Sequence, residues 1–211
     1  MIKNQKQRAK KIIDLLKKEY PDSGCSLKYK SAHQLLVATI LSAQTSDEQV
    51  NKITPDLFAK YKAIEDFAGA DLNQLENDIK SIGLYHNKAK AIKHSAQMIL
   101  HEFGGEVPDS LAELTRLPGV GRKTASVVLG TWFEKAEGIV VDTHVQRISR
   151  FLGLTYEKNA EKVEKDLMEI IPVKDWIIFT HLVIDHGRAV CIARRPQCEI
   201  CALRKQCPSA P

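Results

Sequence analysis

The sequence predicts an all-α protein, because its apolar residues recur at helical spacing almost throughout. The longest strand-like stretch is residues 138–141, and no internal repeat interrupts the helical pattern. Hydrophobic residues make up 44% of the 211 positions and charged residues 27%, which leaves enough apolar material for a sizeable core. We expect no membrane-spanning segment, because no apolar run approaches the roughly 18 residues that one needs.

The predicted helices are marked by capping residues and by breaks. An apolar stripe in residues 11–18 stops at Pro21, and residues 33–43 form an apolar run that is too long for a strand. Serine, aspartate and asparagine caps, with glycines or prolines at the breaks, delimit the other helices. These are expected over residues 46–61, 64–68, 71–82, 87–103, 110–117, 122–133, 159–171 and 175–191, with one more beginning at Asp142.

Charge and cysteine content narrow the class of protein. Lysine and arginine number 31 against 26 acidic residues, a formal charge of +5 that permits a nucleic acid or an anionic membrane as partner. The basic N-terminus lacks an adjoining apolar stretch, so we expect no secretory signal. Four of the five cysteines lie after residue 190, which favours a metal site over a disulfide framework, and Cys25 is expected to be inert.

The C-terminal cysteines follow the spacing C-x6-C-x2-C-x5-C and are Cys191, Cys198, Cys201 and Cys207. Structural zinc sites with four cysteines usually pair two short knuckles, whereas this pattern contains one. The wider gaps suit the larger cage of a 4Fe–4S cluster, and on spacing alone both metals stay open. Arg194 and Arg195 lie in the first gap, on a loop held at both ends, where they either clamp a phosphate or are simply solvated.

A second motif joins two predicted helices and reads LPGVGRKTA over residues 117–125. Gly119 and Gly121 let the backbone turn tightly, and the free N–H groups of the next helix form an anion site suited to one phosphate. The alternative is a plain helix–helix corner. Lys123 lies in the first turn, where the helix dipole disfavours its ammonium form. It is either a phosphate-binding surface lysine or a nucleophile, and a neutral amine near pH 7 requires roughly 4.6 kcal/mol from its surroundings, mainly from burial.

Asp142 precedes Thr143-His144-Val145 at the start of a predicted helix. Its simplest role is that of N-cap, because an aspartate there accepts a hydrogen bond from the first turn. An ionised cap that faces a cleft can also orient water or stabilise a developing cation. The two roles are compatible.

These motifs resemble those of the endonuclease III family of DNA glycosylases, within the helix-hairpin-helix superfamily. The resemblance rests on residues 41–47 (LSAQTSD), 117–125 and 141–145 (VDTHV) and on the four-cysteine tail, in family order across nearly the whole chain. The combination of tail and hairpin implies a 4Fe–4S cluster rather than zinc. Two departures leave the preference among damaged bases open: Thr45-Ser46 stands where Ala-Thr is common, and His86 where a small polar residue is common.

The resemblance implies two helical domains that flank a DNA-binding cleft. One is a six-helix barrel over residues 22–133 that contains the helix-hairpin-helix motif. The other combines residues 1–21 and 134–211 and holds the cluster.

The resemblance also implies roles for single residues. Lys123 matches the family's Schiff-base lysine and Asp142 its catalytic aspartate. Gln44 matches the residue that enters the space left by an extruded nucleotide. Leu84 matches a wedge that pushes into the base stack, although without the family it reads as an ordinary exposed hydrophobe. The other implied DNA contacts are Gly119, Val120, Gly121, Arg122, His144, Arg194 and Arg195.

The implied function is base excision repair by a monomeric enzyme of the bacterial cytoplasm that is associated with the nucleoid. Such an enzyme excises oxidised pyrimidines from double-stranded DNA and cleaves abasic sites by β-elimination. One alternative is a monofunctional adenine-mismatch glycosylase, which typically lacks the hairpin lysine and carries a further C-terminal domain. The other is a non-catalytic, cluster-bearing DNA-binding module, in which the lysine and aspartate would be accidental.

Overall fold

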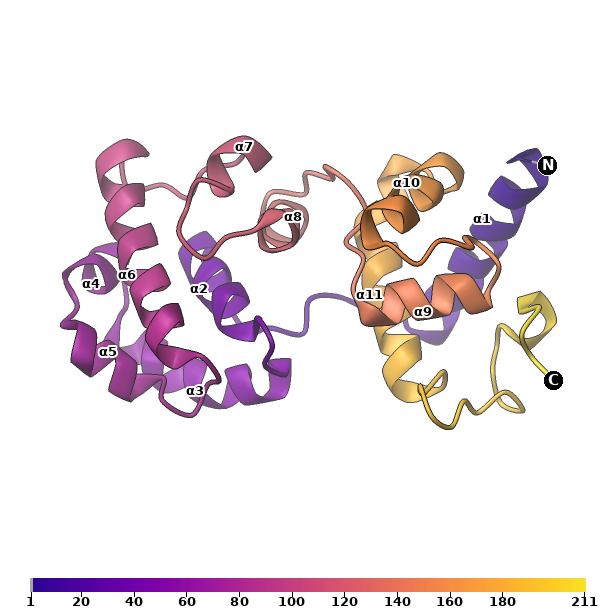
Figure 1. Cartoon of the computed structure of the whole chain (residues 1–211), viewed down its shortest axis with the longest axis horizontal. Coiled ribbons are helices and arrows are strands. Elements are labelled where there is room, and N and C mark those ends of the chain that lie inside the picture. The colour runs from indigo at the N-terminus through magenta and orange to yellow at the C-terminus, as the bar shows by residue number, and fades with distance from the viewer. Residues whose placement is uncertain (1) are drawn as a thin grey trace. The chain divides into compact units, whose positions relative to one another are not determined.

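The structure is a computed structural model that describes residues 2–211, with side chains from residue 4 onward. Met1, the first residue of the predicted cluster domain, lies outside the described residues. Helices are the only regular elements in this range, which confirms the predicted all-α class (Figure 1). Within the same range, no helix combines the length and the apolar character that a membrane span needs.

The chain divides into two compact units. One is Ser26–Lys135, and the other combines Met1–Cys25 with Ala136–Pro211. The sequence-based division placed the corresponding boundaries after residues 21 and 133.

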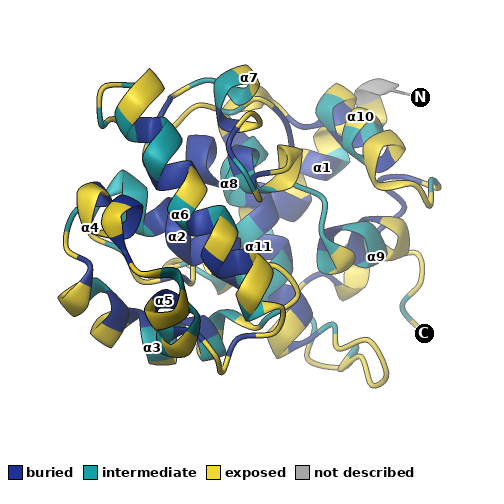
Figure 2. Ribbon diagram, turned by 60° about the vertical axis from the view of Figure 1, so that its left-hand side comes forward, coloured by how far each residue is buried: buried dark blue, intermediate teal, exposed yellow. Residues whose placement is uncertain are grey.

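The unit Ser26–Lys135 is organised around a single buried helix, α2 (Ala32–Ser42). Every residue of α2 from Leu35 to Leu41 is buried, and the helix contacts α3, α6 and α8 (Figure 2). The remaining helices are α3 (Asp47–Lys60), α4 (Ile64–Gly69), α5 (Leu72–Asp78), α6 (Tyr85–Glu102), α7 (Leu111–Leu114) and α8 (Arg122–Trp132). Because α2 is apolar all round, its neighbours can pack on it from several sides.

The second unit is organised around α11 (Trp176–Ala189), which contacts α1 (Ile2–Glu19) and α9 (Thr143–Phe151). The other elements are α10 (Ala160–Ile170) and two 3₁₀ turns, η1 (Val173–Asp175) and η2 (Arg204–Gln206). The helices α9 and α11 approach closely at Gly187, where a Cβ atom would lie 2.4 Å from His144 Nδ1. Glycine is therefore required for α9 to pack against α11 in this position.

Three predicted helix boundaries were wrong. The first helix begins at Ile2 rather than at residue 11, because Ala9 extends its buried face by a turn. The helices α5 and α7 end before residue 82 and residue 117, respectively. The apolar residues beyond their ends, such as Ile82 and Leu117, are buried from turns, and periodicity does not distinguish such residues from helical ones.

Candidate functional site

The turn between α7 and α8 uses its two glycines for different purposes. Gly119 has a φ of +75°, and a Cβ atom on it would lie 2.6 Å from Ala91 Cβ, so the fold itself requires glycine there. Gly121 has a φ of −84°, is the N-cap of α8, and a Cβ atom on it would meet nothing within 4 Å. The chain therefore gives no internal reason for glycine at position 121, which leaves open space beside the start of α8.

Val120 packs inside the protein and stabilises the turn. Its side chain is buried, and its N–H donates to the carbonyl of Leu117 at 3.1 Å. The Val120 side chain and N–H are therefore not free to bind an anion, and the expected anion site is left to the residues that follow it. The N–H groups of the first turn of α8 have no preceding helical carbonyl to receive them, and this turn begins at Arg122.

Lys123 lies in that first turn and is exposed. Within the described residues its ammonium makes no hydrogen bond or ion pair, so the amine is open to a ligand. An exposed amine at a helix terminus that attracts anions is accessible to a phosphate-bearing ligand.

Gln44 and Leu84 share an unusual backbone conformation. Gln44, between α2 and α3, has a φ of +56°, and Leu84, the N-cap of α6, has a φ of +61°. Both side chains are exposed, and Leu84 exposes 57% of its surface. Residues other than glycine in this left-handed region cost of order 1–3 kcal/mol each and persist where the surrounding structure imposes them. Two large exposed side chains are thus held at strained positions in the same unit.

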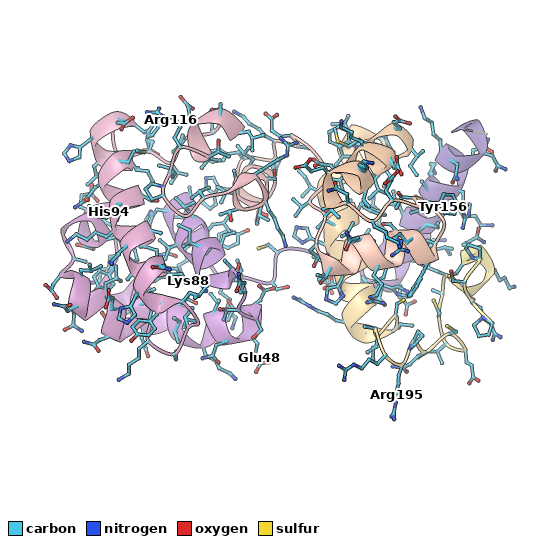
Figure 3. All side chains as sticks on the ribbon, viewed as in Figure 1. Glu48, Lys88, His94, Arg116, Tyr156 and Arg195 are labelled. Atoms are coloured by element: carbon cyan, nitrogen blue, oxygen red, sulfur yellow. The ribbon has the colours of Figure 1, made fainter. Side chains whose placement is uncertain are left out.

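Sequence reasoning missed Lys88, a buried lysine on α6 (Figure 3). Its Nζ donates to the carbonyls of Leu41 at 2.8 Å and Ala43 at 2.7 Å and to the hydroxyl of Thr45 at 3.0 Å. Burial lowers the pKa of Lys88. One signal could have revealed it: Lys88 continues the buried stripe that Ile92 marks on the same helix, where an apolar residue is expected.

Asp142 is the N-cap of α9, as predicted. Its Oδ1 accepts a hydrogen bond from the Val145 N–H at 2.8 Å, and the residue is half-buried. His144, two residues further on, turns its ring against Gly187, and its Nδ1 is buried with no hydrogen-bond partner among the described residues. Only the other edge of this imidazole is therefore available to anything outside the unit.

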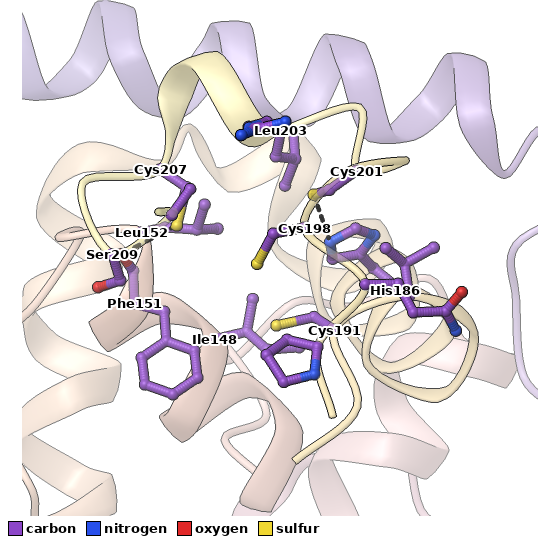
Figure 4. A pocket seen from close by; sticks show the side chains of 15 residues that line it. Ile148, Phe151, Leu152, His186, Cys191, Cys198, Cys201, Leu203, Cys207 and Ser209 are labelled. Carbon is purple, nitrogen blue, oxygen red and sulfur yellow. Dashed lines mark hydrogen bonds between the residues drawn. The ribbon is translucent and has the colours of Figure 1, made fainter. Parts of the chain in front are cut away.

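The four C-terminal cysteines line one cavity of about 140 Å³ in the second unit (Figure 4). They are half-buried, and none forms a disulfide within the described part of the chain. Among the described residues no group of three histidine, cysteine or acidic side chains is close enough to hold a single metal ion. A cavity that holds one water needs only about 10–15 Å³, so this one is large for a lone ion. Four thiol donors around this space fit a metal group held by thiolates.

Two polar side chains contact cysteine sulfurs. The Nη1 of Arg147 lies 3.6 Å from Cys191 Sγ, and Nε2 of His186 lies 3.5 Å from Cys201 Sγ. Burial, reinforced by the Arg147 guanidinium, lowers the pKa of His186 to about 4, so this ring is neutral at pH 7. Burial also raises the pKa of the Cys191 thiol, which the Arg147 guanidinium opposes.

A backbone hydrogen bond closes the loop between Cys191 and Cys198. The N–H of Gln197 donates to the carbonyl of Val190 at 2.9 Å. Arg194 and Arg195 are exposed on this loop, and Figure 3 shows Arg195 extending away from the ribbon. The two guanidinium groups therefore stand on a short segment anchored at both ends.

Known proteins are similar to this chain over nearly its full length. Residues 37–173 match the family described as HhH-GPD superfamily base excision DNA repair protein. Endonuclease III of Synechocystis sp. is 51% identical over 207 residues, which are 98% of this chain and 94% of that protein. Endonuclease III of Escherichia coli K12 is 37% identical, with 96% and 95% of the two chains covered. The chain belongs to the endonuclease III family.

Solved structures agree with this membership. A trapped endonuclease III–DNA covalent intermediate, an estranged-adenine complex, has a TM-score of 0.90 and 44% identity, and covers 97% of this chain and 96% of its own. A thermostable thymine-DNA glycosylase, at 24% identity and a TM-score of 0.80, shares the fold. As an endonuclease III family member, the protein is a base excision repair enzyme with DNA glycosylase and AP lyase activities. The family carries a 4Fe–4S cluster.

Proposed function

We propose that this protein acts as a monomer on double-stranded DNA at the bacterial nucleoid, where it excises oxidised pyrimidines and cleaves abasic sites through a Schiff base on Lys123. The observation that carries the proposal is the exposed amine of Lys123 in the first turn of α8, which has no partner among the described residues. A nucleophile at this position is reached easily, because DNA can approach the backbone beside it and the N-terminus of α8 attracts a phosphate of the DNA.

DNA is held through its backbone. The N–H groups at the start of α8, with the side chain of Arg122, face one phosphate, and Arg194 and Arg195 face others. Such contacts carry no sequence information, which suits an enzyme that must find damage in any sequence. Gly121 serves this contact, because a Cβ atom there would meet no part of the protein but would stand beside the incoming phosphate.

A base within a duplex is out of reach, so the damaged nucleotide is extruded. Unstacking costs a few kcal/mol, and less for an oxidised base that has lost its planarity. Gln44 and Leu84 fill the space that the nucleotide leaves and hold the duplex open.

Chemistry begins when the Lys123 amine attacks C1′ of the sugar. The new N–C1′ bond forms as the glycosidic bond breaks and the base leaves with the bonding electrons. The Asp142 carboxylate either takes the lysine proton or stabilises the positive charge that develops on the sugar. The sugar ring then opens as the C1′–O4′ bond breaks and O4′ takes a proton, which leaves a Schiff base between C1′ and the Lys123 nitrogen. The Schiff base acidifies C2′, and loss of a C2′ proton breaks the C3′–O bond and expels the 3′ phosphate, which cuts the strand.

We assign Cys191, Cys198, Cys201 and Cys207 as the ligands of the 4Fe–4S cluster. When bound, the cluster supplies structure, because four thiolates leave it no open position. Cys191 and Cys198, as its ligands, would then hold the loop of Arg194 and Arg195 in place, so that little ordering entropy would be lost when DNA binds.

Borohydride trapping tests the proposal. The wild-type protein is expected to give a covalent adduct with abasic and thymine-glycol duplexes and none with undamaged DNA. Excision from an adenine mismatch without an adduct would instead support the monofunctional alternative. Binding to all these duplexes without any excision would support the non-catalytic one.

The hairpin glycines give a matched pair of variants. Gly119→Ala is expected to lower the free energy of unfolding by about 1–3 kcal/mol, because its Cβ atom collides with Ala91 and its φ is left-handed. Gly121→Ala is expected to cost less than about 1 kcal/mol, the difference between glycine and alanine at an N-cap, and to weaken DNA binding. Chemical denaturation and DNA titration measure both effects. Unchanged affinity in Gly121→Ala would contradict the phosphate contact at this turn.

The cysteine assignment predicts iron and inorganic sulfide in equal amounts in protein purified without oxygen. Replacing Cys201 with serine is expected to remove most of the iron. It should also lower DNA affinity and flatten its salt dependence, because the arginine loop loses its anchor and each lost phosphate contact reduces the slope by about 0.9. The double variant Arg194→Gln/Arg195→Gln is the control, since it should flatten the slope while iron stays bound. Colourless protein loaded with zinc would contradict the assignment.

A further inference from the structure

Lys88 is a buried charge that the proposed reaction does not use. Only 5% of its surface is exposed, and its partners are carbonyl and hydroxyl oxygens rather than a carboxylate. An ammonium has three donors, and all three are satisfied here. Because a buried charge persists only where it is fully hydrogen-bonded, the oxygens around Lys88 form a specific site for it.

The acceptors of Lys88 lie on the segment that carries Gln44. The carbonyls of Leu41 and Ala43 belong to the end of α2, where carbonyls lack helical partners and the helix dipole is negative. The Thr45 hydroxyl lies on the other side of Gln44. Lys88 therefore binds the chain immediately before and after the left-handed residue, and its charge suits both the dipole and the unpaired carbonyls.

The backbone of Lys88 reaches the second left-handed residue. Its N–H donates to the carbonyl of Leu84 at 3.1 Å, which closes the first turn of α6. One residue thus contacts the Gln44 segment through its side chain and Leu84 through its main chain. All of these atoms belong to the unit Ser26–Lys135.

We infer that Lys88 is a positioning residue. It fixes the Gln44 and Leu84 segments relative to each other, so that both side chains are in place for insertion into duplex DNA before the DNA binds. The inference rests on the proposed roles of Gln44 and Leu84. A pair held in place before DNA arrives loses less conformational entropy on insertion than two independent loops would. Thr45, where the sequence departs from the common family pattern, completes the site by accepting the third hydrogen bond.

The test compares two substrates. Excision of thymine glycol from a duplex requires the space in the stack to be filled, whereas cleavage of an abasic site in single-stranded DNA does not. Lys88→Met is expected to slow the duplex reaction about 10- to 100-fold, the scale of a displaced positioning group, and to leave the single-strand reaction unchanged. Lys93→Met is the matched control, because Lys93 also lies on α6 and donates to one carbonyl, that of Ala70. It should leave the ratio of the two rates unchanged.

Thr45 supplies variants that keep the lysine. Thr45→Val, which removes only the hydroxyl, is expected to lower the duplex-to-single-strand ratio several-fold, and Thr45→Ser should restore it. If Lys88 acts through Gln44, adding Lys88→Met to Gln44→Ala should lower the ratio less than Lys88→Met alone does. If Lys88→Met fails to fold, the ratios measured for Thr45→Val and Thr45→Ser test the inference instead.

The outcomes separate this inference from the proposed function. If Gln44→Ala leaves the ratio unchanged, the insertion role of Gln44 is wrong and the inference falls with it. If Gln44→Ala lowers the ratio while Lys88→Met and Thr45→Val do not, insertion stands and the positioning role of Lys88 is overturned. Equal losses on both substrates in the folded Thr45→Val variant would also overturn it.

Discussion

Replacing Lys123 with alanine is expected to abolish the borohydride-trapped adduct and to slow excision and strand cleavage by at least about 10⁴-fold, the scale on which nucleophiles act. The protein should remain as stable as wild type, because the side chain is exposed and makes no hydrogen bond or ion pair in the described structure. Alanine is also a better helix former, and it removes a positive charge from a helix N-terminus. Single-turnover cleavage of a thymine-glycol duplex measures the loss, and thermal unfolding checks the fold.

Lys123→Arg distinguishes the two roles that this position allows. An arginine keeps the positive charge and its attraction for phosphate, but its guanidinium stays protonated and cannot form the Schiff base. We expect this variant to bind DNA as the wild type does and to give no adduct. If Lys123→Arg still cleaved DNA and formed an adduct, Lys123 would be a phosphate contact and the nucleophile would have to be another amine.

The second large effect is expected at Asp142. Replacing it with asparagine should slow excision by about 10²- to 10⁴-fold, the usual range for a general acid or base. Stability and DNA affinity should hold, because asparagine caps a helix as well as aspartate does and its side-chain oxygen can still accept from the Val145 N–H. Rates under single-turnover conditions, together with DNA affinity and unfolding temperature, separate the charge of Asp142 from its capping role.

Asp142→Ala is the matched control for the cap. It removes both functions, so it should lower the free energy of unfolding by about 1 kcal/mol in addition to slowing the reaction. If Asp142→Asn were as active as the wild type and Asp142→Ala were merely less stable, Asp142 would be a structural cap alone.

Local signals predicted most of the helices correctly. The caps at Ser46, Asp71, Ser110 and Asn159 accept the hydrogen bonds that their residue types indicated. These features depend on neighbours within four residues, which the sequence displays directly. The errors occurred where burial extended or replaced a local pattern, as at the start of α1 and the ends of α5 and α7.

The sequence by itself determined the all-α class, the four-cysteine spacing and the motifs that place Lys123 and Asp142 at helix starts. Only the tertiary structure decided that Lys88 holds the segment of Gln44 from more than 40 positions away and that Gly119 serves packing while Gly121 does not. It also decided that Val120 is buried. The reason is physical: helical period and capping chemistry are local, whereas the partner of a buried polar group is chosen by how helices distant in sequence pack against one another.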